Sequence, residues 1–423
     1  MNNNGIEFKL PPNFNEFSQD EKSKFFEENY FSNVNLFENC KGNIVKYKTI
    51  LVDEIQDYHR PWMDLIKENF LSDDGEYVLW GDEKQNIYGN ELEEKDLKTN
   101  VKGRPSELKD SFRSVKKIKD LAVQFQKNNF THKYVIDNFD ELPQLLPDYD
   151  NPSTINYLYF ENEKAIDIIK LHELISEYSI RLKEHPNDIT VLGFRISVLR
   201  EFECYYRYKT KERTNAMFET QEVWYKLFLQ TFAKAETVNQ GLIIVNGASE
   251  EDKKNKLAVL LAIRDLITQT NDPSFTERFD HFLDKYQVKK LDFDNWYNSN
   301  ELSTLLNRDK HSSLKRLEAE YPQYKQLTKS LKTVRDNKKH HFWYDRGTIK
   351  LSTIHSFKGW EANTLFLILE EQFDNSDFIT SFEELIYTAI TRSKTNLIVL
   401  NYGNTIHHEQ MVALFDKYNK GFS

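Results

Sequence analysis

The sequence predicts an α/β protein in which a parallel sheet is interrupted by a mostly helical insertion. Three observations support this fold class. Apolar runs of strand length recur along the chain, stretches of helical spacing lie between many of them, and helical spacing dominates the residues from about 210 to 345. Continuous apolar strands that alternate with helices are typical of a parallel sheet buried on both faces.

Each predicted strand is a short run rich in Ile, Leu, Val and aromatic residues. The runs lie at 49–52, 77–80, 155–160, 189–194, 242–245, 348–352, 364–369 and 396–400. Sheets of this kind bind ligands where their strands end. Functional side chains are therefore expected directly after these runs.

The segment 211–345 is predicted to be the helical insertion. Leu257, Leu260 and Leu261 lie near one helical face, and Asp272 followed by Pro273 is typical of a helix start. Apolar residues at helical spacing follow in 275–286 and 302–306.

Composition and charge limit the class of protein. The chain has 423 residues, enough for two or three domains, and its net charge of −10 argues against a protein that coats nucleic acid by bulk charge, although not against a local basic groove. No apolar run approaches the roughly 18 residues of a membrane span. Two cysteines, Cys40 and Cys204, argue against a disulfide framework. We expect a soluble protein of the reducing cytoplasm with no membrane partner.

The stretch "ILVDEIQD" places Asp53, Glu54 and Asp57 at the end of a predicted strand. One carboxylate there could hold magnesium (Mg2+), which prefers oxygen ligands, and its neighbour could deprotonate a water during phosphoryl transfer. The alternative is a solvated turn whose acids cap the next helix.

The stretch "WGDEKQNIYG" follows the next predicted strand. Gly81 permits a close backbone approach, Gln85 could sense a phosphate or a water, and Tyr88 could stack on a base. A half-buried aromatic of the ordinary kind is the alternative for Tyr88.

These stretches belong to an ordered set that resembles the motifs of UvrD/Rep-like superfamily 1 helicases. "ILVDEIQD" resembles motif II (Walker B), "WGDEKQNIYG" motif III, "LKDSFRSVKKI" at 108–118 motif IV, "IKLSTIHSFKGWEANTLFLIL" at 349–369 motif V and "ELIYTAITRSKTNLIVL" at 384–400 motif VI. The stretch "ITVLGFRISVLREFE" at 189–203 resembles the strand and turn that follow motif IV. The resemblance implies two RecA-like lobes of the P-loop NTPase type, ATP and Mg2+ as cofactors, and single-stranded or partly duplex DNA as partner.

The resemblance also implies roles for single residues. Asp53 would hold Mg2+, Glu54 would activate the hydrolytic water, and Gln85 would couple the γ-phosphate to the strand-binding surface. Arg113 and Arg392 would reach the γ-phosphate from the second lobe, because a guanidinium is always charged and forks onto phosphate oxygens. A surface ion pair is the alternative for Arg392.

Motif V implies further contacts. Thr353 and His355 would contact the nucleic-acid backbone, Gly359 would allow close approach to the nucleotide, and Glu361 would hydrogen-bond its ribose. A structural histidine is the alternative for His355. Two departures affect strand contacts: Trp360 stands where the family has Leu or a similar residue, and the acidic "GNELEEKD" follows motif III.

The predicted domains are an incomplete first lobe at 1–104, a second lobe at 105–210 and 346–423, and the helical insertion at 211–345. A phosphate-binding loop needs Gly-Lys-Ser/Thr, and none of the 13 glycines is followed by lysine. We therefore expect the C-terminal portion of an ATP-dependent DNA helicase or translocase that is inactive alone, with a partner chain as one source of the Walker A half. A fragment, a separately encoded half and a true loss of the loop all remain open.

Two functions of other classes compete with this interpretation. The acids Asp53, Glu54 and Asp57 could serve a metal-dependent nuclease, although motifs V and VI would then be unexplained. A non-hydrolysing, helicase-like DNA-binding or regulatory subunit of a repair or antiviral complex is the stronger alternative.

Overall fold

The computed structural model divides the chain into two compact units. Unit 1 comprises Met1–Ser153 and Phe373–Thr391, and unit 2 comprises Thr154–Gln372 and Arg392–Ser423. The structure describes residues 10–12, 14, 17, 19–33, 35–38, 42, 44–88, 92–93, 96–97, 99–101, 106, 113–137, 153–161, 166–220, 223, 227, 322–344, 346–370, 382–416 and 418. The strand predicted at 242–245 and the helical stretches predicted within 257–306 lie outside these residues.

Unit 1 contains the early elements and one late helix. In chain order they are α1 (Gln19–Phe26), the π-helical turn η3 (Glu27–Phe31), β1 (Tyr47–Val52), the 3₁₀ turn η5 (Ile55–Asp57), α2 (Arg60–Phe70), β2 (Leu71–Leu79), the 3₁₀ turn η6 (Glu83–Gln85), β3 (Leu92–Glu93), β4 (Asp96–Leu97), α3 (Lys116–Asn129) and α14 (Phe382–Thr391). β3 and β4 form a small antiparallel pair.

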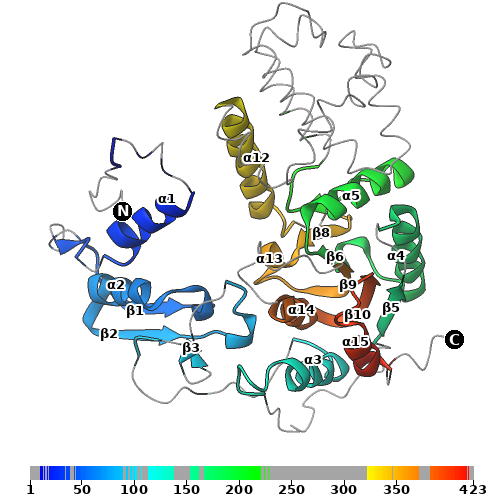
Figure 1. Cartoon of the computed structure of the whole chain (residues 1–423), viewed down its shortest axis with the longest axis horizontal. Helices are drawn as coiled ribbons and strands as arrows, with labels where there is room; N and C mark the ends of the chain where they lie inside the picture. The colour runs from blue at the N-terminus through cyan, green and yellow to red at the C-terminus, as the bar shows by residue number, and fades with distance from the viewer. Residues whose placement is uncertain are drawn as a thin grey trace, which may run out of the picture. The chain divides into compact units, whose positions relative to one another are not determined.

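The centre of unit 1 is a parallel pair of strands, β1 and β2, joined by α2 (Figure 1). Pro61 lies in the first turn of α2, where its missing N–H leaves no hydrogen bond unmade. α2 packs on one face of the pair: Met63 is buried, and the Tyr77 hydroxyl donates to its carbonyl oxygen over 3.4 Å. The predicted strands at 49–52 and 77–80 are thus confirmed, with their C-terminal ends within one residue, although β1 begins at Tyr47 and β2 at Leu71.

The other face of this pair carries exposed apolar side chains. Tyr47 and Leu51 on β1 are 53% and 60% exposed, and Val78 on β2 and the following Trp80 are 45% and 39% exposed. Leu51 pairs with Val78 in the register, and side chains two residues apart point to the same face. Parallel sheets are normally covered on both faces, so this face is unusually open.

Unit 2 contains the large sheet. Its elements are β5 (Ile155–Phe160), α4 (Ile168–Leu182), the 3₁₀ turn η7 (Pro186–Asp188), β6 (Ile189–Gly193), α5 (Ile196–Thr210), β7 (Asn215–Ala216), α12 (Pro322–His340), β8 (Lys350–Thr353), α13 (Ile354–Phe357), β9 (Ala362–Glu370), β10 (Ser393–Tyr402) and α15 (His408–Phe415).

The six strands of unit 2 run in the order β5-β10-β9-β6-β8-β7, and every pairing is parallel. The strands predicted at 155–160, 189–194, 348–352, 364–369 and 396–400 are confirmed as β5, β6, β8, β9 and β10. This sheet is compatible with a RecA-like fold. The division into two such lobes with an insertion stays a prediction.

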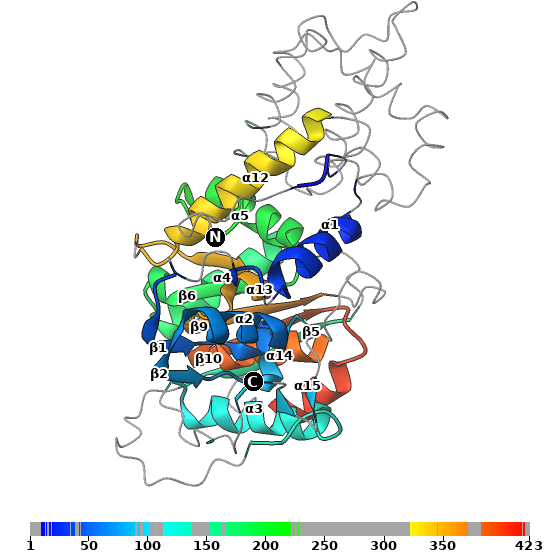
Figure 2. The same ribbon diagram turned by 90° about the vertical axis from the view of Figure 1, so that its left-hand side faces the viewer.

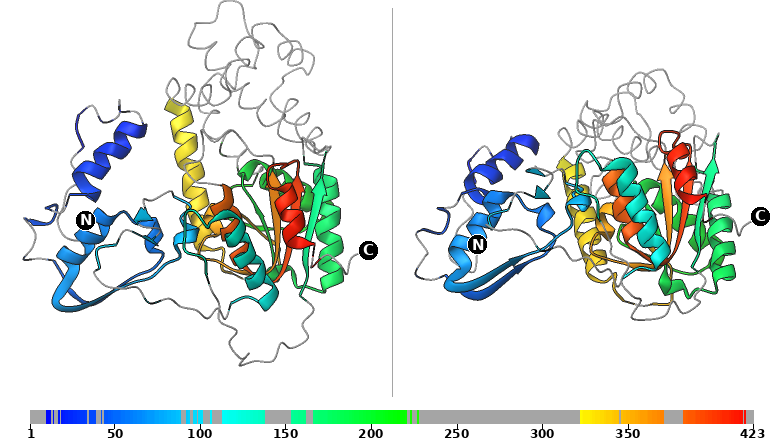
Figure 3. Two further views of the ribbon diagram at one scale, coloured as in Figure 1. Left: turned by 60° about the horizontal axis from the view of Figure 1, so that its bottom comes forward. Right: turned by 90° about the horizontal axis from the view of Figure 1, so that it is seen from below.

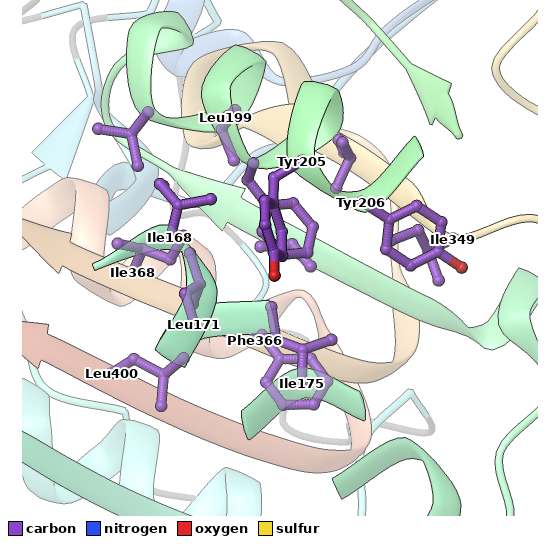
Figure 4. Close-up of a cluster of buried hydrophobic side chains, with 14 of the residues drawn as sticks. Ile168, Leu171, Ile175, Leu199, Tyr205, Tyr206, Ile349, Phe366, Ile368 and Leu400 are labelled. Carbon is purple, nitrogen blue, oxygen red and sulfur yellow. The ribbon is translucent and has the colours of Figure 1, made fainter. Parts of the chain in front are cut away.

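The core of unit 2 lies between the sheet and the helices α4 and α5. Leu171 and Ile175 of α4 and Leu199 of α5 pack on Phe366 and Leu400 of the strands (Figure 4). On the opposite face, Tyr157 and Tyr159 of β5 meet Phe415 and His408 of α15. β5 therefore lies between α15 and α4 (Figure 3). Among the described residues, no helix is long and apolar enough to span a bilayer.

Candidate functional site

The end of β1 places two acids on a constrained turn. Glu54 has a left-handed backbone, with φ 53° and ψ 49°, which non-glycine residues seldom adopt. Asp53 Oδ1 accepts a hydrogen bond from the Glu54 N–H over 2.8 Å, and Gln56 Nε2 donates to Glu54 Oε2 over 2.5 Å. The exposed Asp53 and the half-buried Glu54 carboxylates are thereby oriented separately.

Gln56 connects this turn to the end of β2. Its Oε1 accepts the N–H of Asp82 over 3.2 Å, and its side chain is fully buried. A Cβ atom on Gly81 would lie 2.2 Å from that Oε1 and 2.9 Å from the Ile55 nitrogen, so only glycine fits. The acids predicted after the first strand and the polar residues predicted after the second therefore meet at one edge of the β1–β2 pair.

Beyond Gly81, the side chains of motif III turn inward. Gln85, only 7% exposed, donates from Nε2 to Asp82 Oδ2 over 2.8 Å. The hydroxyl of Tyr387 on α14 donates to the same oxygen over 3.4 Å, and Gln126 on α3 donates to that hydroxyl over 2.9 Å. Burial raises the pKa of Asp82, against the opposing attraction of Lys84.

The buried Lys84 was not expected from the sequence. Its ammonium group lies 2.7 Å from Glu83 and 2.9 Å from Asp137, and the residue is 3% exposed. Burial alone would lower the Lys84 pKa, but attraction by Asp82, Asp137 and Glu83 outweighs burial and raises it. One signal of a buried lysine was available in the sequence, because Lys84 lies in the stretch "GDEKQNIYG" directly after an apolar run. Its partner Asp137 lies too far along the chain to be inferred.

Two more predicted residues of unit 1 lie near its surface. Tyr88 is 51% exposed, and burial of its hydroxyl and repulsion from Asp57 raise its pKa. Arg113 is exposed and precedes α3 by three residues, while 108–112 of the motif IV stretch lie outside the described residues. The exposure of Tyr88 leaves room for the predicted base contact.

In unit 2, motif V forms the turn from β8 into the short helix α13. Thr353 caps α13 by accepting the Ser356 N–H over 3.4 Å. Burial lowers the pKa of the half-buried His355. Gly359 has φ 84°, a left-handed conformation that favours glycine, and it is exposed.

Arg392 and Glu361 lie at the amino ends of neighbouring strands. The carbonyl oxygen of Arg392 accepts the Ala362 N–H over 2.9 Å, so the starts of β10 and β9 are tied together. Arg392 is 2% exposed, whereas Glu361 is exposed and forms an ion pair with Lys394. The structure thus brings Glu361 and Arg392 to one edge of the unit 2 sheet.

Trp360, the departure within motif V, has a structural partner. Its ring lies 5.3 Å from that of Phe342 at an interplanar angle of 81°, and Phe342 also meets Phe357 at 6.1 Å. The larger side chain in motif V therefore fills space against an aromatic that follows α12. Sequence reasoning missed this pair because Phe342 lies outside every motif and 18 residues before Trp360.

The donor set at the end of β1 fits a magnesium ion held together with phosphates. Among the described residues, no group of three or more His, Cys, Asp and Glu side chains could hold a metal ion. Magnesium retains several waters and commonly takes only one or two carboxylates beside phosphate oxygens. The exposed Asp53 carboxylate meets that need. Asp53 belongs to unit 1 and Arg392 to unit 2, and their meeting across a nucleotide stays a prediction.

Comparison with known proteins points to helicases at a distance. No family model matches the chain. The chain is similar to the mitochondrial ATP-dependent DNA helicase HMI1 of Saccharomyces cerevisiae, with 24% identity over an alignment that covers 89% of this chain. The chain spans 63% of the length of that relative. This similarity supports a relationship to helicases in general.

Proposed function

We propose that the chain is the C-terminal portion of an ATP-dependent DNA helicase or translocase of the UvrD/Rep type, and that it does not hydrolyse ATP alone. The observation that carries the proposal is the Gln56 bridge. It joins Glu54 to the Asp82 backbone at 2.5 and 3.2 Å, and so brings the motif II and motif III stretches to one strand edge. The similarity to an ATP-dependent DNA helicase supports the same function.

In this proposal each side chain has a defined task. Asp53 would hold magnesium from the exposed end of β1, and bound Mg-ATP would supply the phosphoanhydride that is cleaved. The Glu54 carboxylate, which the Gln56 amide orients, would accept the proton of the attacking water. Arg113 and Arg392 would stabilise the charge that develops on the transferred phosphoryl group.

The missing phosphate-binding loop would come from residues outside these 423. The open apolar face of the β1–β2 pair supports this, because Leu51, Val78 and Trp80 lie exposed where a parallel sheet is normally covered. We infer that a polypeptide segment bearing Gly-Lys-Ser/Thr covers this face, either in a longer protein or in a partner chain.

The test is steady-state ATP hydrolysis in the presence of oligo(dT). The chain alone is expected to show no activity above background. The chain joined to, or mixed with, a segment that carries the loop is expected to show DNA-stimulated hydrolysis. In that complemented protein Glu54→Gln should lower kcat at least about 100-fold, and Arg392→Ala about 10³-fold.

The matched control is Glu68→Gln, an exposed acid on α2 that should leave kcat unchanged within about twofold. DNA-stimulated hydrolysis by the chain alone, or full activity of Glu54→Gln in the complemented protein, would contradict the proposal.

One observation favours the alternative of a non-hydrolysing DNA-binding or regulatory subunit. The Gln85 amide, predicted to sense the γ-phosphate, is buried and donates to Asp82 instead. If complementation restores DNA binding but never hydrolysis, this alternative replaces the first.

A further inference from the structure

An aromatic stack lies exposed where α12 leads into β8, outside every motif singled out in the sequence. Trp343 and Tyr344 are 57% and 41% exposed, and their rings stack with centroids 3.9 Å apart at 26°. His341 stacks on Tyr344 at 5.8 Å and 23°, and the Arg346 guanidinium lies 5.6 Å from the Tyr344 ring centroid. Two adjacent large aromatic rings in water are a marked departure from ordinary surface composition.

Buried neighbouring residues fix the position of the stack. Phe342, 1% exposed, inserts between Phe357 and Trp360 of motif V. The Asn215 side chain donates to the Phe342 carbonyl over 2.9 Å and to the Tyr344 carbonyl over 3.3 Å. The exposed rings therefore stand on a fixed turn, which reduces the conformational entropy lost when a ligand binds.

Exposed basic side chains lie on a second segment that adjoins this turn. The end of α5 and the loop to β7 supply Lys209, Lys211 and Arg213, all exposed. Asn215, two residues after Arg213, makes the hydrogen bonds to the aromatic turn, so the two segments adjoin. Lys211 also lies over the exposed Tyr208 ring at 4.6 Å, which repeats the pairing of a cation with an aromatic. Figure 2 shows α12 beside α5.

Lys338, near the end of α12, lies close to two further cations, Arg207 and Arg346. Burial lowers its pKa, attraction by Glu203 opposes that effect, and repulsion from Arg207 and Arg346 lowers the pKa further. Arg207 on α5 and Arg346 after α12 are thus close enough to act on one ammonium group.

Two acids near this turn are already engaged. Glu203, 2% exposed, pairs with Arg207 over 3.0 Å, and Glu212 accepts the Tyr206 hydroxyl over 3.0 Å. Asp345 lies outside the described residues. In a chain with net charge −10, this concentration of exposed cations runs against the overall balance.

We propose that this aromatic–basic surface is a platform for single-stranded DNA. The surface is defined by residues 208–213, 339–344 and 346. A base stacks on the open face of Trp343, and Lys339, Arg346 and the cations of 209–213 hold the flanking phosphates. The inference deepens the proposed function by naming a strand contact in unit 2.

The combination of features selects this ligand class. Aromatic platforms with basic neighbours bind single strands with little sequence preference, because every base has a π-face and every linkage a charge. A duplex would hide its bases from the Trp343 ring. An apolar protein partner would use the rings but not the five surrounding cations.

The experiment measures binding of fluorescein-labelled oligo(dT) to the full chain by anisotropy at several salt concentrations. Trp343→Ala with Tyr344→Ala should weaken binding about 5- to 100-fold, while Trp343→Phe, which keeps a stacking ring, should stay within about threefold of wild type. Lys339→Ala with Arg346→Ala should weaken binding and reduce the slope of log K against log salt by about 1 to 2.

The matched charge control is Lys329→Ala with Lys332→Ala, two exposed lysines earlier on α12, which should change neither affinity nor slope. Oligo(dA) should bind like oligo(dT), and oligo(rU) and a blunt duplex are the comparison ligands. Tighter binding of the duplex would overturn the stacking proposal. If the aromatic variant loses the same factor of affinity for oligo(rU) as for oligo(dT), the platform stacks on bases without discriminating the sugar.

Wild-type affinity in the Trp343→Ala, Tyr344→Ala variant would overturn the proposal, as would the absence of any oligonucleotide binding by the chain. Neither result touches the proposed ATPase, which is tested by Glu54→Gln in the complemented protein. Conversely, loss of binding in the aromatic variant together with failed complementation would sustain the platform and refute the motor.

Discussion

The hydroxyl of Tyr387 donates to the carboxylate of Asp82 over 3.4 Å and so joins α14 to the turn that follows β2. Tyr387 lies five residues before Arg392, and Asp82 also accepts from Gln85. Side chains of motifs III and VI thus share one carboxylate. If α14 moved, the Asp82 carboxylate that Tyr387 contacts would also move, and Gln85 is hydrogen-bonded to the same carboxylate. This is a physical route for coupling the two stretches.

Tyr387→Phe is expected to destabilise unit 1. The variant removes the hydroxyl that serves Asp82 and Gln126, and it leaves a buried amide and carboxylate with one partner fewer. The cost should be about 1–3 kcal/mol in the free energy of unfolding. Urea denaturation followed by circular dichroism measures it, with Tyr208→Phe, an exposed tyrosine, as control. A Tyr387→Phe midpoint equal to that of the wild type would exclude the role assigned to this hydroxyl.

Gly81→Ala should damage the turn that joins the two strand ends. The added methyl would meet Gln56 Oε1 at 2.2 Å and the Ile55 nitrogen at 2.9 Å, and one of these atoms is backbone. We expect a loss of about 1–3 kcal/mol of stability, as for other overpacked sites. Gly42→Ala is the control, because a Cβ there meets nothing within 4 Å. Equal thermal midpoints for the two variants would show that the turn accommodates the added methyl group without loss of stability.

Glu219 should act as the anchor between α5 and α12. It is fully buried, accepts from Arg335 over 2.5 and 2.8 Å, and pairs with Arg200. Glu219→Ala leaves two cations without their shared carboxylate, so about 3–5 kcal/mol should be lost. Lys116→Ala, which breaks an exposed pair with Asp120, should cost less than about 1 kcal/mol. Denaturant titration compares them, and similar costs would refute the anchor.

His172 should make unit 2 sensitive to acid. Burial lowers its pKa below the ordinary 6.5, repulsion from Lys209 adds to that effect, and Glu173 opposes it. Below pH 6.5 the unfolded chain takes up a proton that the folded chain resists, so the free energy of unfolding falls as the pH falls. Well above pH 6.5 His172 is neutral in the folded and in the unfolded chain, so this loss of stability is absent.

His172→Phe should therefore lose less stability than wild type between pH 7 and pH 5.5, by up to about 1.4 kcal/mol per pH unit. The new ring can pack on Tyr205 and Tyr206, which lie 5.4 and 5.8 Å from the histidine ring. Thermal unfolding at several pH values is the measurement, with His340→Gln at an exposed position as control. Parallel pH profiles for wild type and His172→Phe would exclude His172 as the source.

The strands of unit 2 could be predicted because each is a local signal. A run such as 365–369 is apolar throughout, and that composition is typical of a strand buried on both faces. The beginning of β2 could not be predicted: Leu71–Gly75 contains Ser72, Asp73 and Asp74, and nothing in that composition favours a strand.

The candidate site was predictable only in its local parts. Asp53, Glu54 and Gly81 follow apolar runs, so their place at strand ends could be foreseen. The hydrogen bonds among Gln126, Asp137 and Tyr387 join distant segments, and no periodicity encodes such a pairing. The same holds for Phe342 and Trp360, whose contact explains a residue that motif comparison alone marks only as unusual.

The pairing of β5 with β10 has a consequence for biosynthesis. Ile155 sits opposite Leu397, so the outer strand of the large sheet waits for a partner near the other end of the chain. On a ribosome β5 emerges long before β10 is made, and its edge stays open to neighbours on the same messenger. Closure of unit 2 therefore waits until β10 has been made, and nascent chains stalled before residue 393 should be clients of chaperones.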